Sequence, residues 1–94
     1  MIKINLRSRF KKNPQTITKK IGGELVILDP IAGEIRSLNQ TASLIWENIQ
    51  PKITVDEIIK KICQKYEISV EKAKKEAINF LDKYLKIGLI KPVK

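Results

Sequence analysis

Residues 16 to 38 alternate between polar and apolar positions in the way that short strands do. Thr16–Ile21 is β-branched and alternating, and Gly22–Gly23 supplies the positive-φ residues that a tight hairpin turn requires. Glu24–Leu28 is apolar on both faces, which is typical of a central strand, and it ends before a proline that cannot donate to a ladder. After a turn, Glu34–Leu38 is shorter and more polar. The pattern predicts a three-stranded antiparallel sheet with Glu34–Leu38 at its edge.

From Asn39 onward, apolar residues recur at the three- and four-residue spacing of helices. Asn39 can cap a first helix that ends near residue 49. Thr54 and Glu57 have the spacing of a capping box for a second helix, Ser69 can cap a third, and Gly88 stands where a left-handed C-terminal residue is wanted. The predicted apolar stripes are Ala42, Ile45, Trp46 and Ile49; Val55, Ile58, Ile59, Ile62, Cys63 and Tyr66; and Val70, Ala73, Ala77, Phe80, Leu81, Tyr84 and Leu85.

Three strands followed by three helices predict an α+β domain of winged-helix-turn-helix type, with the helices on one side of the sheet. The 94 residues allow one domain. We expect a basic N-terminal arm over residues 1–12 and the folded domain over residues 13–94. On this interpretation, deletion of residues 1–11 leaves the fold intact and slows association with a partner.

The net charge of +9 is distributed unevenly along the chain. Residues 1–23 hold seven Lys and Arg residues and no acid, whereas residues 24–94 hold 12 basic and 10 acidic residues. A basic segment of this kind attracts polyanions, whether nucleic acid or an acidic peptide, and raises the encounter rate more than it identifies a partner. A solvated tail that aids solubility is the alternative.

The composition excludes several classes of chemistry. There is no His and Cys63 is the single Cys, so the chain has no Ser-His-Asp or Cys-His site, no His-ligated zinc and no CxxC pair. We expect no cofactor and no metal. The longest apolar run, Leu25–Leu28, is far too short to cross a bilayer, and the N-terminus lacks the apolar region of a signal peptide. A cytoplasmic location without a membrane partner is therefore expected.

Residues in both halves of the chain resemble one family. Gly23–Asp29, Gly33–Asn39 and the positions Ala42, Ile45 and Trp46 are followed by Thr54–Ile58 and by a closing segment. In this order and spacing, over about residues 14 to 91, they are similar to the PqqD-like proteins, the peptide-recognition elements of ribosomal peptide modification. The closing segment consists of Phe80, Leu81, Leu85 and Gly88 to Ile90.

The resemblance implies a non-catalytic binder of a precursor's leader segment. The leader would lie as an added strand beside the third strand and against the third helix, and the rest of the precursor would be presented to a separate maturation enzyme, such as a leader protease, a cyclase or a radical enzyme. Lasso-peptide maturation is one such pathway. We expect the protein to be a monomer or a weak homodimer.

The candidate peptide-binding residues lie on these two elements. An edge strand offers unpaired backbone groups to an extended peptide. Beside the core stripe of the third helix, Phe80 could form an apolar floor, Glu76 and Lys83 could pair with leader charges, and Asn79 could hydrogen-bond. Phe80 could equally be core, and Glu76 and Lys83 could be a solvated face. The full candidate set is Glu34, Ile35, Arg36, Ser37, Leu38, Glu76, Asn79, Phe80 and Lys83.

The sequence departs from the family pattern at two positions, and two other classes of function remain as alternatives. The family often has Asp at the position of Glu76, and an aromatic residue at Ile35 or Arg36. A winged-helix nucleic-acid binder could use the basic arm to contact phosphates, although interleaved acids on the helices argue against it. An interaction domain could use the same edge strand to form a homodimer. No acid–base pair or nucleophile suggests an enzyme.

Overall fold

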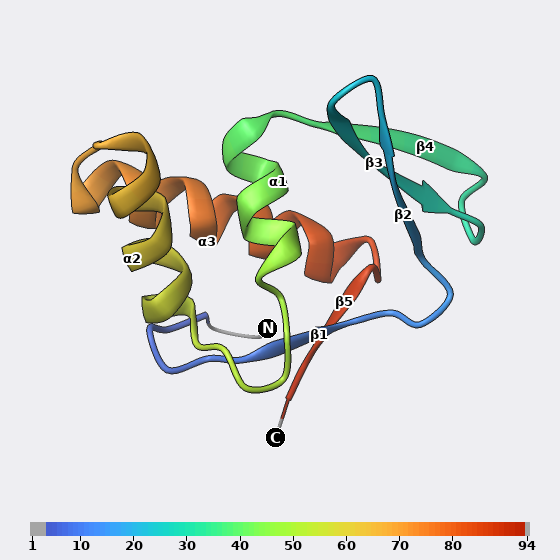
Figure 1. Ribbon diagram of the computed structural model, residues 1–94. Coiled ribbons are helices and arrows are strands. Elements are labelled where there is room, and N and C mark those ends of the chain that lie inside the picture. The colour runs from blue at the N-terminus through green and yellow to red at the C-terminus, as the bar shows by residue number, and fades with distance from the viewer. Residues whose placement is uncertain (1–3, 94) are drawn as a thin grey trace.

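The computed structural model describes residues 4–93 and confirms the α+β class, with three helices and a three-stranded antiparallel sheet. The helices lie on one side of this sheet, and β1 and β5 lie side by side beneath the helices (Figure 1). The elements in chain order are β1 (Phe10–Lys12), β2 (Ile17–Ile21), β3 (Glu24–Asp29), β4 (Glu34–Leu38), α1 (Gln40–Glu47), α2 (Val55–Tyr66), α3 (Val70–Lys86) and β5 (Ile90–Pro92).

The three-stranded sheet has the order β2-β3-β4, with the predicted central strand in the middle. Gly22 and Gly23 have φ of 60° and 86°, so they form the predicted two-residue turn, and Ile21 pairs with Glu24 across it. On β3, Leu25 and Ile27 face the helices and are buried. β4 pairs with β3 on one side and, within residues 4–93, with no strand on the other.

Local capping signals fix where the helices begin. The Asn39 side chain accepts a hydrogen bond from the Ala42 N–H at 2.8 Å, and α1 starts at the next residue after Asn39. The predicted capping box is present, because the Thr54 N–H donates to Glu57 Oε1 at 3.1 Å and the Glu57 N–H donates to Thr54 Oγ1 at 3.3 Å. Ser69 caps α3 through the Lys72 N–H. Each helix therefore starts where the sequence predicts.

Trp46 joins the helices to the sheet. Its side chain is fully buried on α1, and its indole N–H donates to Thr18 Oγ1 on β2 at 2.8 Å. The ring also contacts Tyr84 of α3, with 5.9 Å between ring centroids. A buried indole N–H needs a partner, so this bond satisfies the tryptophan and fixes β2 over α1.

A second sheet was not predicted. β1 pairs with β5 in antiparallel register, so segments about 80 residues apart in sequence lie side by side. Phe10 of β1 is only 3% exposed and belongs to the main core. Just upstream, the Val55 and Asp56 N–H groups donate to the backbone carbonyls of Ser8 and Leu6, both at 3.0 Å.

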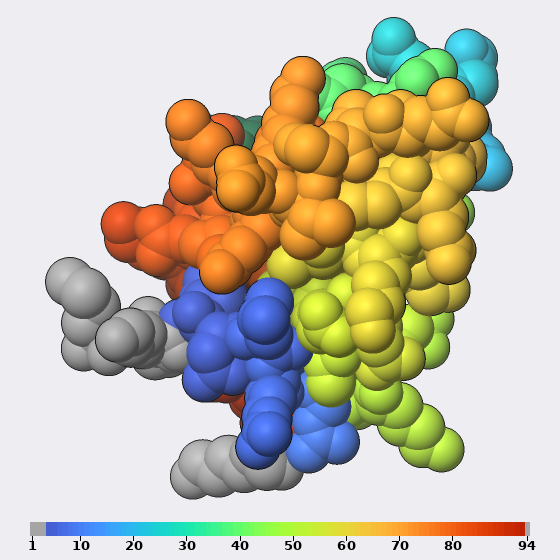
Figure 2. All heavy atoms as spheres, turned by 90° about the vertical axis from the view of Figure 1, so that its left-hand side faces the viewer, coloured from blue at the N-terminus to red at the C-terminus, as the bar shows by residue number. Residues whose placement is uncertain are grey.

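The expected arm over residues 1–12 is therefore wrong for the part that the structure describes. Residues 4–12 lie against the helices, and Figure 2 shows this segment (blue) set between the α2 and α3 sides of the molecule. The charge pattern concealed the packing, because one apolar residue, Phe10, stands among Arg9, Lys11 and Lys12. Residues 1–3 of the expected arm lie outside the described residues.

Candidate functional site

The open edge of β4 is the first part of the candidate site. In a two-residue hairpin the closing pair, Ile21 and Glu24, exchanges both backbone hydrogen bonds, and such pairs then alternate along the strands. Leu25, Ile27 and Asp29 of β3 therefore turn their backbone groups toward β4, where they meet Leu38, Arg36 and Glu34. The intervening residues, Ile35 and Ser37, turn their backbone N–H and C=O groups outward. These are the groups an added strand would pair with.

A hollow between α1 and α3 is the second part of the site. It has a volume of about 240 Å³. Phe80 forms part of its wall, half-buried, and stacks on Tyr84 with 4.0 Å between ring centroids and 17° between ring planes. The lining residues are Asn39, Thr41, Ala42, Ile45, Glu76, Asn79 and Phe80. An apolar wall with an acid and amides around it can take an apolar side chain next to a polar or basic one.

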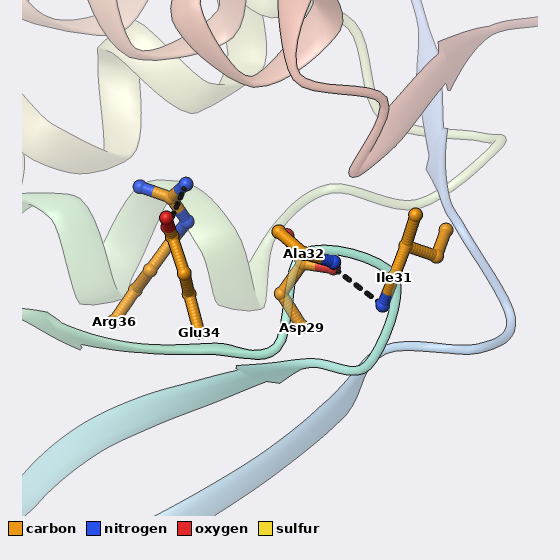
Figure 3. A network of polar contacts seen from close by, with 5 residues as sticks. All are labelled: Asp29, Ile31, Ala32, Glu34 and Arg36. Atoms are coloured by element: carbon orange, nitrogen blue, oxygen red, sulfur yellow. Dashed lines mark hydrogen bonds and ion pairs between the residues drawn. The ribbon is translucent and has the colours of Figure 1, made fainter.

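Arg36 and Glu34 form the third part of the site. Both side chains leave the same face of β4, and Figure 3 shows them rising toward the helices. Arg36 Nη2 donates to Glu34 Oε2 at 2.7 Å. Burial raises the pKa of the Tyr84 hydroxyl above its usual value, and the positive charge of Arg36 opposes that rise. The positive charge of Arg36 therefore acts on the hydroxyl of Tyr84, the residue whose ring Phe80 stacks on.

The turn before β4 is held by Asp29, the buried charged side chain at the end of β3. Its Oδ1 accepts hydrogen bonds from the Ile31 and Ala32 N–H groups, at 3.1 and 3.2 Å (Figure 3). This arrangement is an Asx turn, in which a side chain replaces a backbone acceptor. It fixes where β4 begins and hence which residues face the open edge.

The structure brings most of the candidate residues together. Glu76, Asn79 and Phe80 line one hollow, whereas Lys83 is exposed and does not line it. Leu38 is buried in the core and does not point outward. Phe80 fits both interpretations, since it packs against the core and lines the hollow.

Sequence reasoning missed the α1 side of the hollow. Thr41, Ala42 and Ile45 supply it, together with the cap residue Asn39. The available signal was the short step from β4 into α1, with only Asn39 between the two elements. That step places the first turn of α1 next to the end of β4.

A larger cavity of about 500 Å³ lies on the other side of α1, toward the β2–β3 hairpin and the end of α2. Lys20 and Glu24 line it from the hairpin, Glu47 from α1, and Lys65 from α2. The Tyr66 hydroxyl donates to the Gln40 carbonyl at 3.2 Å and closes one side. Its charges are of mixed sign, so it indicates no particular ligand.

The outer face of the three-stranded sheet, away from the helices, carries several exposed apolar side chains. Ile17 is 50% exposed, Ile21 60% and Ile35 72%, and Ile31 in the adjacent turn is 67% exposed. In the register, Ile17, Leu28 and Ile35 form one continuous row across the three strands. We call Ile17, Ile21, Leu28 and Ile35 the outer apolar face. Exposed patches of this kind mark contacts with other molecules.

The described residues contain no cluster of metal-ligating side chains and no helix suited to span a membrane. Within residues 4–93, no group of three or more Cys, Asp or Glu side chains is placed to hold a metal ion. Among the same residues, no helix has the length and apolar character needed to span a bilayer.

Comparison with known proteins gives three results. The family model for coenzyme PQQ synthesis protein D (PqqD) matches residues 24–90. TbiB1 in complex with the TbiA(beta) leader peptide has a TM-score of 0.76 at 22% identity, over 86% of this chain and 94% of that chain. A lasso peptide synthetase B1 complexed with the leader peptide has a TM-score of 0.78 at 21% identity, over 89% and 99%. No curated protein is similar enough to count as a match.

Proposed function

This chain belongs to the PqqD family, and on that premise we propose that it binds the leader segment of a ribosomally synthesised precursor peptide. The leader pairs with β4 as an added strand, lies against α3, and is presented to a modifying or processing enzyme. The binding protein does no chemistry of its own. The observation that carries the proposal is the open edge of β4 beside a hollow between α1 and α3.

The proposal follows from what an open strand edge can bind. Main-chain pairing with Ile35 and Ser37 supplies register and much of the affinity, whatever the leader's side chains are. Specificity comes from alternate leader side chains, which point toward α3 on one face of the enlarged sheet. The hollow beside Phe80 then holds one apolar leader residue. The two similar solved structures, each in complex with a leader peptide, support leader binding by this fold.

A proline scan of the two sheet edges tests the proposal. Ser37→Pro removes one outward N–H from β4, and Lys20→Pro removes the equivalent outward N–H from β2, at the opposite edge. We expect Ser37→Pro to weaken binding of the cognate leader peptide by about tenfold or more, because a backbone hydrogen bond is lost and the proline ring obstructs the approach of the peptide. Lys20→Pro leaves the affinity unchanged.

Isothermal titration gives the affinities, and NMR shift mapping gives the location. In the wild type, shifts concentrate on Glu34–Leu38 and on Glu76, Asn79, Phe80 and Lys83. Equal weakening by both proline variants, or shifts confined to β2, would show that β4 is not the docking edge.

The proposal includes a second partner, a separate maturation enzyme, which we place on the outer apolar face. In a leader strand added to β4, half of the side chains would lie beside Ile35 and Ser37. The strand would therefore extend the outer apolar face. The outer apolar face and the peptide edge are therefore continuous, and an enzyme docked on the one is held next to the precursor on the other. The exposed isoleucines Ile17 and Ile21, which lie away from the β4 edge, support this second contact.

A further inference from the structure

Arg36 has donors that the protein itself does not satisfy. Its Nε is buried and, among residues 4–93, finds no hydrogen-bond acceptor, whereas Nη2 is engaged by a single oxygen of Glu34. An arginine side chain presents N–H groups in a fixed fork that fits a carboxylate side-on through two parallel bonds. Glu34, two residues away on the same strand, meets only one arm of that fork. The guanidinium group of Arg36 is thus only partly satisfied by hydrogen bonds within the described residues.

Arg36 also lies where an added strand would bring a side chain closest. Ile35 and Ser37 carry the outward backbone groups, so in an added antiparallel strand the residue opposite Arg36 falls in a non-hydrogen-bonded pair. Such pairs have the shorter separation between strands, and opposite charges in them attract. Because Arg36 faces the helices, the opposing side chain would enter between β4 and α3 (Figure 3).

Glu34 is held loosely by comparison. Its side chain is 55% exposed, against 21% for Arg36. A carboxylate that is mostly in water loses little solvation when it is displaced, and the ion pair that it leaves is a near-surface one of small net strength. A ligand carboxylate that reached both arms of the fork would replace one contact with two.

We propose that Arg36 recognises an acidic side chain of the bound leader and that Glu34 occupies its place in the free protein. The ligand group is an Asp or Glu of the leader strand, opposite Arg36 or next to that position on the face toward α3. This inference rests on the proposed leader binding. It predicts that Glu34 competes with the ligand, which is the reverse of the effect expected if Glu34 only held Arg36 in position.

A displayed library of random 20-residue peptides tests the inference without knowledge of the natural leader. Selection on the wild type enriches peptides with Asp or Glu at one fixed position. In a selected peptide, changing that acid to its amide weakens binding by about tenfold, since a charge-assisted pair is lost. On the variant Arg36→Gln the same acid-to-amide change in the peptide has less than about a twofold effect. In this double-mutant cycle the partner of the acid has already been removed, so no coupling energy is left. Glu34→Gln strengthens binding of the acidic peptide by about threefold, since the competing charge is removed.

The outcomes separate the inference from the proposed function. If peptides are enriched through β4 without an acidic position, or if the acid-to-amide change costs the same on Arg36→Gln, the inference is wrong and leader binding stands. If no peptide is enriched, both are wrong. Far-UV circular dichroism and Trp46 fluorescence confirm the fold of Arg36→Gln. Should that variant not fold, Glu34→Gln decides alone, because it keeps Arg36, and weaker or unchanged binding of the acidic peptide would overturn the inference.

Discussion

The two sheets of this domain differ in how much of them the rest of the chain covers. The small sheet of β1 and β5 joins the two ends of the described chain and contributes Phe10 and Ile90 to the core, both at most 3% exposed. The sheet of β2, β3 and β4 buries one face against the helices and leaves an open edge and an outer apolar face. The first sheet closes the core, and the second offers backbone and apolar groups to other molecules.

Within these 94 residues, we expect the first sheet to contribute mainly to stability and the exposed parts of the second sheet mainly to binding. A domain of this size buries only about 60–65% of its unfolded surface, so every large core side chain matters. Exposed apolar residues on the second sheet add little to that core. We therefore expect substitutions of buried residues in the first sheet to lower the free energy of unfolding, and substitutions of exposed residues on the second sheet to change binding while the fold persists.

The largest expected effect concerns β1. Phe10→Ala leaves a cavity beside the core and should lower the free energy of unfolding by about 3–5 kcal/mol, a large share of the total for a small domain. Deletion of residues 1–11 also removes strand pairing and the carbonyls that accept from Val55 and Asp56, and should abolish folding. Urea unfolding followed by Trp46 fluorescence measures both.

The matched control for this stability test is Ile35→Ala, on the exposed face of β4. That side chain is 72% exposed, so its loss should change the free energy of unfolding by no more than about 0.5 kcal/mol. A truncated chain that unfolds at the wild-type urea midpoint would show that the terminal sheet is dispensable.

The next effect concerns the outer apolar face. The double variant Ile17→Ser with Ile21→Ser removes apolar contact area far from the β4 edge. We expect the rate at which the cognate maturation enzyme processes the precursor to fall about tenfold, as for the loss of central apolar interface residues. The affinity for the leader alone, measured by titration, should stay within about twofold of the wild type, because the sites are separate. A parallel loss of leader affinity would mean that the two surfaces are one.

The smallest effect concerns charge near the N-terminus. Arg7→Gln with Lys11→Gln removes two exposed positive charges without disturbing Phe10. If the leader is acidic, association at low salt should slow by about twofold, and the rate should depend less on ionic strength. Stopped-flow fluorescence measures the rate. An unchanged rate at low salt would show that this basic surface does not steer the peptide.

Short-range signals explain why so much of the fold, and part of the lining of the hollow, was predictable. The capping pair Thr54 and Glu57 and the Gly22–Gly23 turn act over two to four residues, so the sequence displays them directly. The edge position of β4 followed from its polarity, and the α3 residues Glu76, Asn79 and Phe80 followed from helical spacing and the family resemblance. Lys83 shares their helix face by spacing, yet it is exposed and does not line the hollow.

By itself the sequence determined the order of elements from β2 to α3, the residues where the helices start, and the edge strand, because each depends on residues close by in the chain. Only the tertiary structure decided that the basic N-terminal segment is a strand of the core, since its partner β5 is about 80 residues away and a pairing at that separation leaves no local mark. The same reason applies to the hollow between α1 and α3. The partly occupied guanidinium of Arg36 likewise became visible only when strand register and helix packing were both fixed.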